Sequence, residues 1–213
     1  MRFLWLLLPI VMAALRMKTK KYVFSALVTL TCAAIIPFEN GFMLLGFILS
    51  VAGDYLLAHQ KGHPNRFLFG VAFFALAHLA FILHAASGVL WSWRHFSFRP
   101  LALILALALA ALYAAYLARR ILPGQPAAMK IALSGYALIS LAGLYFAMSM
   151  QAGVTLEYWL YVAGIAAIVF SDTMIAEAEF AGRHEAHKLI LPTYYLCHIL
   201  LAASAIAGWV FGI

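Results

Sequence analysis

Long apolar segments follow one another along the whole chain, and only short polar gaps separate them. The segments run over residues 3–15, 22–38, 42–58, 67–87, 100–118, 128–150, 156–176 and 189–211. Most approach the roughly 20 residues that an α-helix needs to cross the hydrocarbon of a bilayer. We therefore expect an all-α, polytopic integral membrane protein of about eight transmembrane helices, with residues 1–213 in a single transmembrane domain.

The scarcity of charge excludes a soluble fold. Only 10% of the 213 residues are charged and 67% are hydrophobic, whereas a soluble domain carries roughly 25% charged residues. A membrane β-barrel does not fit either, because barrel strands alternate with a period of two and stretches such as Leu101 to Leu112 do not. The bilayer is therefore the solvent for most of the chain, and membrane lipids are its expected partners.

The positive charges mark the ends of the apolar segments. The 14 Lys and Arg residues form no basic helix or aromatic-basic stripe, so the net charge of +7 predicts no nucleic-acid partner. Eleven lie in the gaps after the first, third, fifth and seventh segments, whereas Arg2, Arg94 and Arg99 do not. By the positive-inside rule the basic gaps face the cytoplasm and both termini lie outside. This pattern favours a multi-pass protein of a bacterial inner membrane.

One pattern occurs twice in the chain. Gly46 precedes Asp54 by eight positions, and Gly164 precedes Asp172 by eight. The third and seventh segments, which carry this pattern, run in the same direction across the membrane. A parallel duplication of two four-helix halves would produce this repeated pattern, and chance could also produce it.

Acidic residues inside an apolar segment need a reason to be there, because each costs about 2.5–3.5 kcal/mol to insert. Only Asp54 and Asp172 are of this kind. The glutamates are expected in gaps, where water satisfies them: Glu39, Glu157, Glu177, Glu179 and Glu185. We therefore expect the two aspartates, and not the glutamates, to carry function.

Both aspartates are predicted to lie in the cytoplasmic half of the membrane. Counted from the helix ends at a rise of ~1.5 Å per residue, four further polar side chains reach a similar depth: His78, Tyr194, Tyr195 and His198. Two acids that meet in a site of low dielectric constant perturb each other's protonation, which makes them candidates for acid and base catalysis.

Several common enzyme signatures are absent from the sequence. The chain contains no Gly-rich phosphate loop, no GxSxG elbow and no HExxH motif. The chain therefore lacks the usual sequence signatures of a nucleotide-binding enzyme, a serine lipase and a zincin. The chemistry is therefore expected to depend on Asp, His and Tyr side chains.

Three stretches carry a family pattern. They are Gly46 to Leu57 (GFILSVAGDYLL), Phe67 to Phe81 (FLFGVAFFALAHLAF) and Gly164 to Ala176 (GIAAIVFSDTMIA). The first contains GD, the second G-x-x-x-F-x-x-x-H and the third SD. With these motifs the sequence resembles the YhhN-like lysoplasmalogenases, small membrane enzymes that cleave the vinyl ether of lysoplasmalogens.

The resemblance implies roles for particular residues. It makes Asp54 and Asp172 the catalytic pair, and it places His78 and Ser171 in the substrate pocket. Two departures leave other roles open. In helix 189–211 the family pattern resembles a Tyr followed three residues later by Gln, whereas here Tyr195 is followed by His198. After the first helix a Lys-Pro pair is common in the family, whereas this chain has Lys20-Lys21.

The implied reaction is hydrolysis of a lysophospholipid without a cofactor or a metal. Protonation of the vinyl ether gives an oxocarbenium ion, and the water that adds to it releases a fatty aldehyde and a glycerophospho-headgroup alcohol, glycerophosphoethanolamine or glycerophosphocholine. One aspartate would be the acid and the other the base, and the sequence does not assign them. Tyr194, Tyr195 and His198 are expected to bind the substrate, and Lys20, Lys61 and Arg66 are candidate partners of its headgroup or simple topology charges.

Two other functions remain open at this stage. In a metal hydrolase of amide or ester lipids, Asp54, His78, Asp172 and His198 would hold zinc and activate water. In a small proton-coupled transporter, two intramembrane acids and a duplicated helix unit would serve alternating access.

Overall fold

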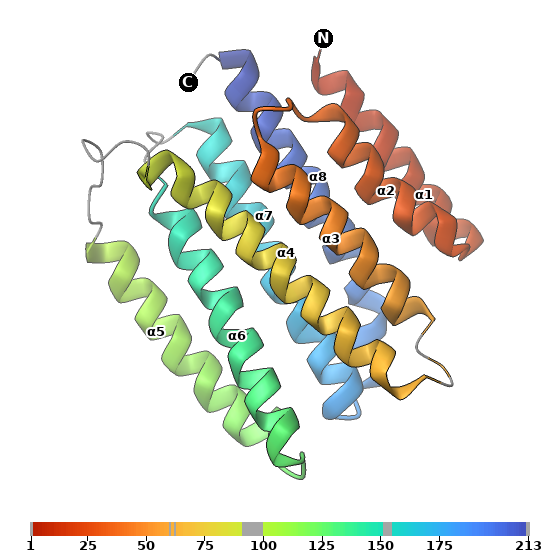
Figure 1. Cartoon of the computed structure of the whole chain (residues 1–213), viewed down its shortest axis with the longest axis vertical. Helices are drawn as coiled ribbons and strands as arrows, with labels where there is room; N and C mark the ends of the chain where they lie inside the picture. The colour runs from red at the N-terminus through yellow and green to blue at the C-terminus, as the bar shows by residue number, and fades with distance from the viewer. Residues whose placement is uncertain (1, 60, 62, 91–99, 151–154, 212–213) are drawn as a thin grey trace.

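The computed structural model describes residues 2–59, 61, 63–90, 100–150 and 155–211, and every regular element within them is helical (Figure 1). The elements are the 3-10 turn η1 (Arg2–Leu6), α1 (Leu7–Thr19), α2 (Tyr22–Ile35), α3 (Gly41–Ala58), α4 (Pro64–Leu90), α5 (Pro100–Tyr116), the π-helical turn η2 (Leu117–Ile121), α6 (Ala127–Met148), α7 (Leu156–Phe180), the 3-10 turn η3 (His184–Ala186) and α8 (His187–Phe211).

Local sequence signals account for several helix ends. Pro64 and Pro100 open α4 and α5, where a missing backbone N–H costs nothing. Thr155 precedes α7, and its side chain accepts a hydrogen bond from the backbone N–H of Tyr158 at 3.3 Å, which is the usual role of an N-cap threonine. Lys20 ends α1 in a left-handed conformation with φ of 59°, which turns the chain into α2.

The helical membrane fold predicted from the sequence is confirmed for most of its helices. Within the described residues, six helices are long and apolar enough to cross a membrane, and they coincide with α3 to α8. The first two predicted spans, residues 3–15 and 22–38, form α-helices that are shorter than these six. The helix α1 has 13 residues and α2 has 14, which gives lengths of only about 20 Å against the ~30 Å of a hydrocarbon core.

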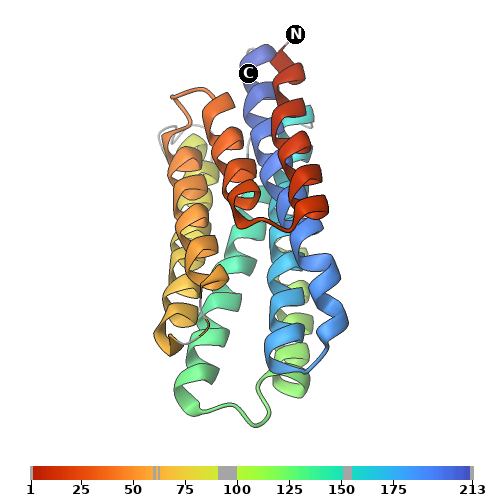
Figure 2. The same cartoon turned by 90° about the vertical axis from the view of Figure 1, so that its right-hand side faces the viewer.

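Most sequential helices pack as antiparallel neighbours, and α4 and α5 are the exception. The pairs α3/α4 and α7/α8 make the most extensive contacts, α4 packs on α6, and α5 lies at the periphery against α6 (Figures 1 and 2). The hairpin α1/α2 covers α8 and α3 near the two chain termini. The core between these helices contains large buried side chains such as Phe47, Phe81 and Tyr161. The Tyr161 hydroxyl donates to the carbonyl of Phe81 at 2.6 Å, which ties α7 to α4.

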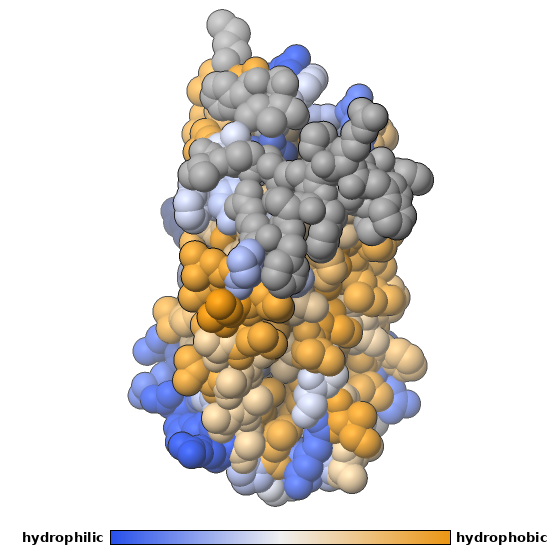
Figure 3. Space-filling view, turned by 90° about the vertical axis from the view of Figure 1, so that its left-hand side faces the viewer, coloured by the Kyte–Doolittle hydropathy of each residue, from blue (hydrophilic) through white to orange (hydrophobic). Residues whose placement is uncertain are grey.

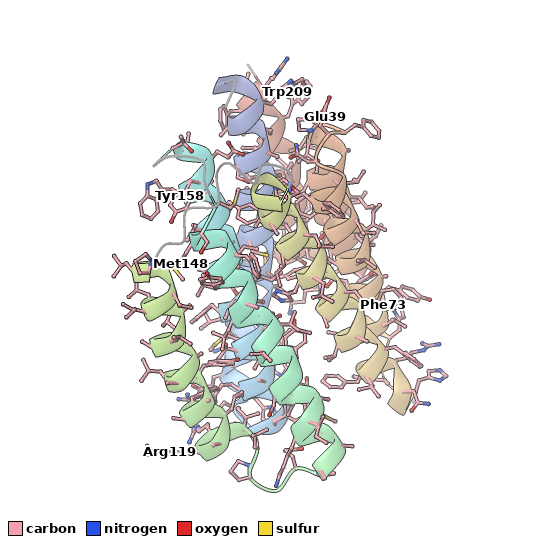
Figure 4. The ribbon with its side chains drawn as sticks, turned by 60° about the vertical axis from the view of Figure 1, so that its left-hand side comes forward. Glu39, Phe73, Arg119, Met148, Tyr158 and Trp209 are labelled. Atoms are coloured by element: carbon pink, nitrogen blue, oxygen red, sulfur yellow. The ribbon has the colours of Figure 1, made fainter. Side chains whose placement is uncertain are left out.

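The charges separate along the bundle as topology signals do. We call the end that carries Lys61, Arg119 and Arg183 the basic end. Figure 4 shows Arg119 at this end and Glu39 and Trp209 at the other, where both termini lie. Figure 3 shows apolar side chains across the middle of one face and hydrophilic ones gathered toward the basic end. Arg94 and Arg99 lie outside the described residues.

The prediction that Glu177 is a water-exposed loop charge is wrong. The helix α7 continues to Phe180, and Glu177 is only 4% exposed. The Tyr116 hydroxyl donates to its carboxylate at 2.6 Å, and Arg120 and Arg183 each lie 3.7 Å from it. A buried carboxylate with three partners is stable where an unpaired one is not, so Glu177 holds the π-helical turn η2 against α7.

The repeated glycines lie at the tightest helix contacts. A Cβ atom on Gly46 would overlap the Phe81 ring of α4, and a Cβ atom on Gly164 would lie 2.9 Å from Leu201 of α8. In both halves the glycine lets the next helix approach closely, which is the usual role of small residues between membrane helices. The similarity agrees with a duplication, which stays a prediction.

Replacing Gly46 by alanine is expected to destabilise the bundle, because the new methyl group would overlap the buried ring of Phe81. Overpacking of this kind costs about 1–3 kcal/mol. Thermal unfolding in detergent should show a clear fall in the melting temperature. The matched control is Gly135→Ala, since nothing lies within 4 Å of a Cβ atom there and alanine favours a helix by about 1 kcal/mol. Equal melting temperatures for the two variants would contradict this account.

Candidate active site

Asp54 and Asp172 line one cavity inside the bundle. The cavity, which we call the chamber, has a volume of about 270 Å³ and extends from the two acids toward the helix ends on the basic side. Its wall comes from α1, α2, α3, α4, α7 and α8: Arg16, Tyr22, Ser25, Asp54, Leu57, Ala58, Phe67, Phe74, Asp172, Ile175, Glu179, His187, Ile190, Leu191 and Tyr194. Two acids from distant parts of the chain therefore face the same space.

Asp172 is held by two donors on neighbouring helices. The Tyr136 hydroxyl of α6 donates to Asp172 Oδ2 at 2.8 Å, and Nε2 of His78 on α4 lies 2.9 Å from the same oxygen. The two donors are 3.2 Å apart and their rings meet edge to face. His78 is 1% exposed and the Asp172 side chain 11%, so His78 is shielded from water while Asp172 faces the chamber. Hydrogen bonds donated to a carboxylate oxygen favour its ionised form.

Asp54 lies in different surroundings. Its Oδ2 atom is buried and has no hydrogen-bond partner, and the hydroxyl of the neighbouring Tyr194 has none of good geometry either. The two groups nevertheless lie close enough to interact electrostatically, and Asp54 also feels the positive charge of Arg16. A carboxyl group whose buried oxygen lacks a donor favours the neutral acid. The two acids of the chamber are therefore not equivalent.

The aromatic residues of α8 take different positions. Tyr194 is 4% exposed and lines the chamber. Tyr195 is 2% exposed and donates its hydroxyl to Ser25 Oγ at 2.8 Å. Because Ser25 lines the chamber and Tyr195 does not, Tyr195 contributes to the wall through its partner.

Two other predicted site residues lie behind the wall of the chamber. His198 is fully buried, and its Nδ1 lies 2.9 Å from the Tyr194 carbonyl, where a ring N–H donates. Ser171 is also fully buried and donates to the Ile190 carbonyl at 3.2 Å, which joins α7 to α8. Neither lines the chamber. In this structure they support the residues next to them, Tyr194 and Asp172.

The cations predicted to meet a headgroup are not at the chamber. Lys20 and Lys61 are exposed, and Arg66 donates from Nη1 to the His59 carbonyl at 2.9 Å. The cation that does line the chamber is Arg16, whose Nε atom is buried and has no hydrogen-bond partner. In the sequence Arg16 is one of the eleven cations that fit a topology signal.

An apolar pocket adjoins the chamber next to Asp172. This pocket, of about 50 Å³, shares Leu57, Phe67, Phe74, Asp172 and Ile175 with the chamber. Its remaining wall includes Leu117, Leu133 and Tyr136 from η2 and α6. Asp172 is therefore bordered on one side by the chamber, which carries some polar groups, and on the other by hydrocarbon side chains.

The side chains needed by the zinc alternative do not converge. In the described part of the chain, no three His, Cys, Asp or Glu residues gather closely enough to hold a metal ion. Asp172 and His78 are in contact, but His198 lies outside the chamber wall. The set of ligands that this alternative requires is thus divided between two places.

Sequence reasoning missed several residues of the site: Tyr136, Arg16, Tyr22, Ser25, Glu179 and His187. The chain has 10 tyrosines, and nothing in the apolar segment 128–150 shows that Tyr136 faces an acid. Arg16 belongs to a cluster with Lys18, Lys20 and Lys21, all of which fit a topology signal equally well. In the structure Arg16 lies in the last turn of α1 together with Lys18, whereas Lys20 and Lys21 follow the helix.

Comparison with known proteins gives one family. A family model described as the YhhN family matches residues 4–205. No curated protein and no solved structure matches the chain. The matched region contains both aspartates and every residue that lines the chamber.

Proposed function

The chain belongs to the YhhN family, and from this membership and the form of the chamber we propose that it is a lysoplasmalogenase. It hydrolyses the vinyl ether bond of a lysoplasmalogen within the membrane and releases a fatty aldehyde and a glycerophospho-headgroup alcohol. The observation that carries the proposal is that two acids with unlike surroundings line one largely apolar cavity. Such a pair supplies a proton donor and a base at one place.

The surroundings of the acids support different parts for them in the reaction. Asp54, whose buried Oδ2 lacks a partner, is the carboxylic acid that protonates the β carbon of the vinyl ether. Asp172, which accepts from Tyr136 and faces His78, is the carboxylate that stabilises the oxocarbenium ion and takes a proton from the attacking water. Tyr136 and His78 are positioning residues, since they act through Asp172.

The protons given and taken by the two acids balance over one turnover. Asp54 gives its proton to carbon, and Asp172 takes one from water as the C–O bond of the hemiacetal forms. When the hemiacetal collapses, the glycerol oxygen leaves with the proton held by Asp172, and the hemiacetal hydroxyl returns its proton to Asp54. The products are one aldehyde and one alcohol, and both acids regain their starting states.

The two cavities suit the two ends of a lysophospholipid. The chamber has polar groups near the basic end, where the headgroup would meet water. The adjoining pocket is lined mostly by hydrocarbon and begins beside Asp172, so it accepts the first carbons of the alkenyl chain. The rest of the chain then lies between helices, in contact with lipid.

The proposal is tested by incubating the purified full chain with lysoplasmenylethanolamine. We expect fatty aldehyde and glycerophosphoethanolamine in equal amounts. In D₂O the aldehyde should carry one deuterium on the carbon next to its carbonyl, because that carbon is protonated in the reaction. The matched control is the 1-O-alkyl analogue, which has no double bond to protonate and should stay intact.

Other outcomes of this assay would favour other functions. Cleavage of the alkyl ether or of an ester analogue would contradict vinyl ether chemistry. Loss of activity after exhaustive chelation, with recovery on adding zinc, would support a metal hydrolase. Passage of the lipid across a vesicle membrane without any product would indicate a transporter.

A further inference from the structure

The hairpin formed by α1 and α2 ends partway along the bundle. Figures 1 and 2 show that the turn between α1 and α2 stops well short of the basic end, where the turns after α3 and α7 lie. The reason is length, because the 14 residues of α2 rise only about 21 Å. The cations of this turn therefore lie deeper in the protein than those of the other basic loops.

Arg16 is the cation of this turn that reaches the chamber. It lies in the last turn of α1 and lines the same cavity as Asp54. Its Nε atom is buried without a hydrogen-bond partner. Within the described residues Arg16 forms no ion pair with a carboxylate. A buried guanidinium N–H that is left unpaired carries an energetic cost which a ligand would remove.

We propose that Arg16 binds the phosphate of the lysophospholipid substrate and so fixes the vinyl ether beside the two acids. The inference rests on the proposed function. A guanidinium group matches a phosphodiester because its planar fork donates two parallel hydrogen bonds to two oxygens. Arg16 is close enough to Asp54 for their charges to interact.

Other polar groups at the same part of the chamber complete the site. Tyr22, Ser25 and His187 line it and can donate to phosphate oxygens. Glu179 lines it as well and forms no ion pair in the part of the chain that the structure describes. A carboxylate there can face the positively charged amine of the headgroup.

The test compares Arg16→Gln with the matched control Lys18→Gln, which removes an exposed cation from the same helix end. Each protein is assayed on lysoplasmenylethanolamine and on 1-O-alkenylglycerol, which has the vinyl ether but no phosphate. For Arg16→Gln we expect kcat/KM on the phospholipid to fall about 10- to 100-fold, mainly through KM, as the loss of a charged hydrogen bond predicts. Its kcat/KM on alkenylglycerol should fall much less, and Lys18→Gln should match the wild type on both substrates. Arg16→Lys should recover part of the loss.

An equal loss on both substrates would overturn the proposal, because Arg16 would then act on Asp54 or on the fold. No loss on either would overturn it too. If the wild type cleaves neither substrate, the proposed function fails, and binding then decides the role of Arg16. In that case glycerophosphoethanolamine should still raise the melting temperature of the wild type and not of Arg16→Gln, and equal shifts or no shift would refute phosphate binding.

Discussion

Replacing Asp54 or Asp172 by asparagine will abolish the release of fatty aldehyde while the protein stays folded. Asparagine keeps the size of the side chain but can neither give the proton that the vinyl ether needs nor take one from water. General acid and base groups contribute about 10²–10⁴ to a rate, so we expect kcat to fall by about 10³-fold or more in either variant. The measurement is aldehyde release from lysoplasmenylethanolamine by protein whose melting temperature matches that of the wild type.

The control for the aspartate variants is Glu185→Gln, which removes an exposed acid near η3 and should leave the rate unchanged. The acid and the base can be distinguished by adding imidazole, which titrates near neutral pH, to the alanine variants and measuring the activity that it restores. The activity restored to Asp172→Ala should depend on neutral imidazole, which replaces the base, and should rise with pH. The activity restored to Asp54→Ala should depend on imidazolium, which replaces the acid, and should fall with pH. Full activity in either asparagine variant would sink the pair mechanism.

Removing the donors that hold Asp172 is expected to have the second largest effect. Tyr136→Phe deletes one hydroxyl and keeps the ring, and His78→Leu deletes the other donor. A hydrogen bond to a charged group contributes about 1.5–3 kcal/mol, so we expect kcat to fall roughly 10-fold for Tyr136→Phe and up to about 100-fold for His78→Leu. KM should hardly change, because Tyr136→Phe keeps the ring that lines the apolar pocket and His78 lines neither cavity. His78→Gln, which retains a donor, should recover part of the loss.

The matched control is Tyr161→Phe. This change also removes a buried tyrosine hydroxyl, but one that donates to the Phe81 carbonyl away from the chamber. It should lower the melting temperature, since a lost buried hydrogen bond costs about 1 kcal/mol, and leave kcat intact. If Tyr136→Phe behaved in the same way, Tyr136 would be a structural residue and not a positioning residue of the reaction.

The ends of the helices show where sequence reasoning is accurate and where it is not. The segment 22–38 becomes α2, which stops at Ile35 just before Pro37, because the residue before a proline avoids the helical region. The segment 156–176 becomes α7, which continues to Phe180. Glu177 looked like the start of a loop because a charge usually means water. Its hydrogen bond from Tyr116 on a helix far away in sequence reverses that expectation.

The candidate site was predictable in part for a similar reason. Asp54 and Asp172 stand out because an acid in an apolar segment is rare and costly, and His78 stands out through its family motif. Tyr136 carries no such mark, because tyrosine is tolerated on any face of a membrane helix. Lys20 and Arg16 are equivalent as topology charges, and only the short hairpin decides that Arg16 and not Lys20 reaches the chamber.

The apolar segments, the two intramembrane acids and their approximate depth follow from the sequence alone, because the bilayer fixes helix length and each residue advances a helix by about 1.5 Å. The rotation of each helix about its axis does not follow. These helices are apolar on nearly every side, so no polar face indicates which side chains point inward. The tertiary packing, which depends on close contacts such as that of Gly46 with Phe81, determines these rotations. It brings Tyr136 into contact with Asp172 and places Arg16 on the same cavity as Asp54.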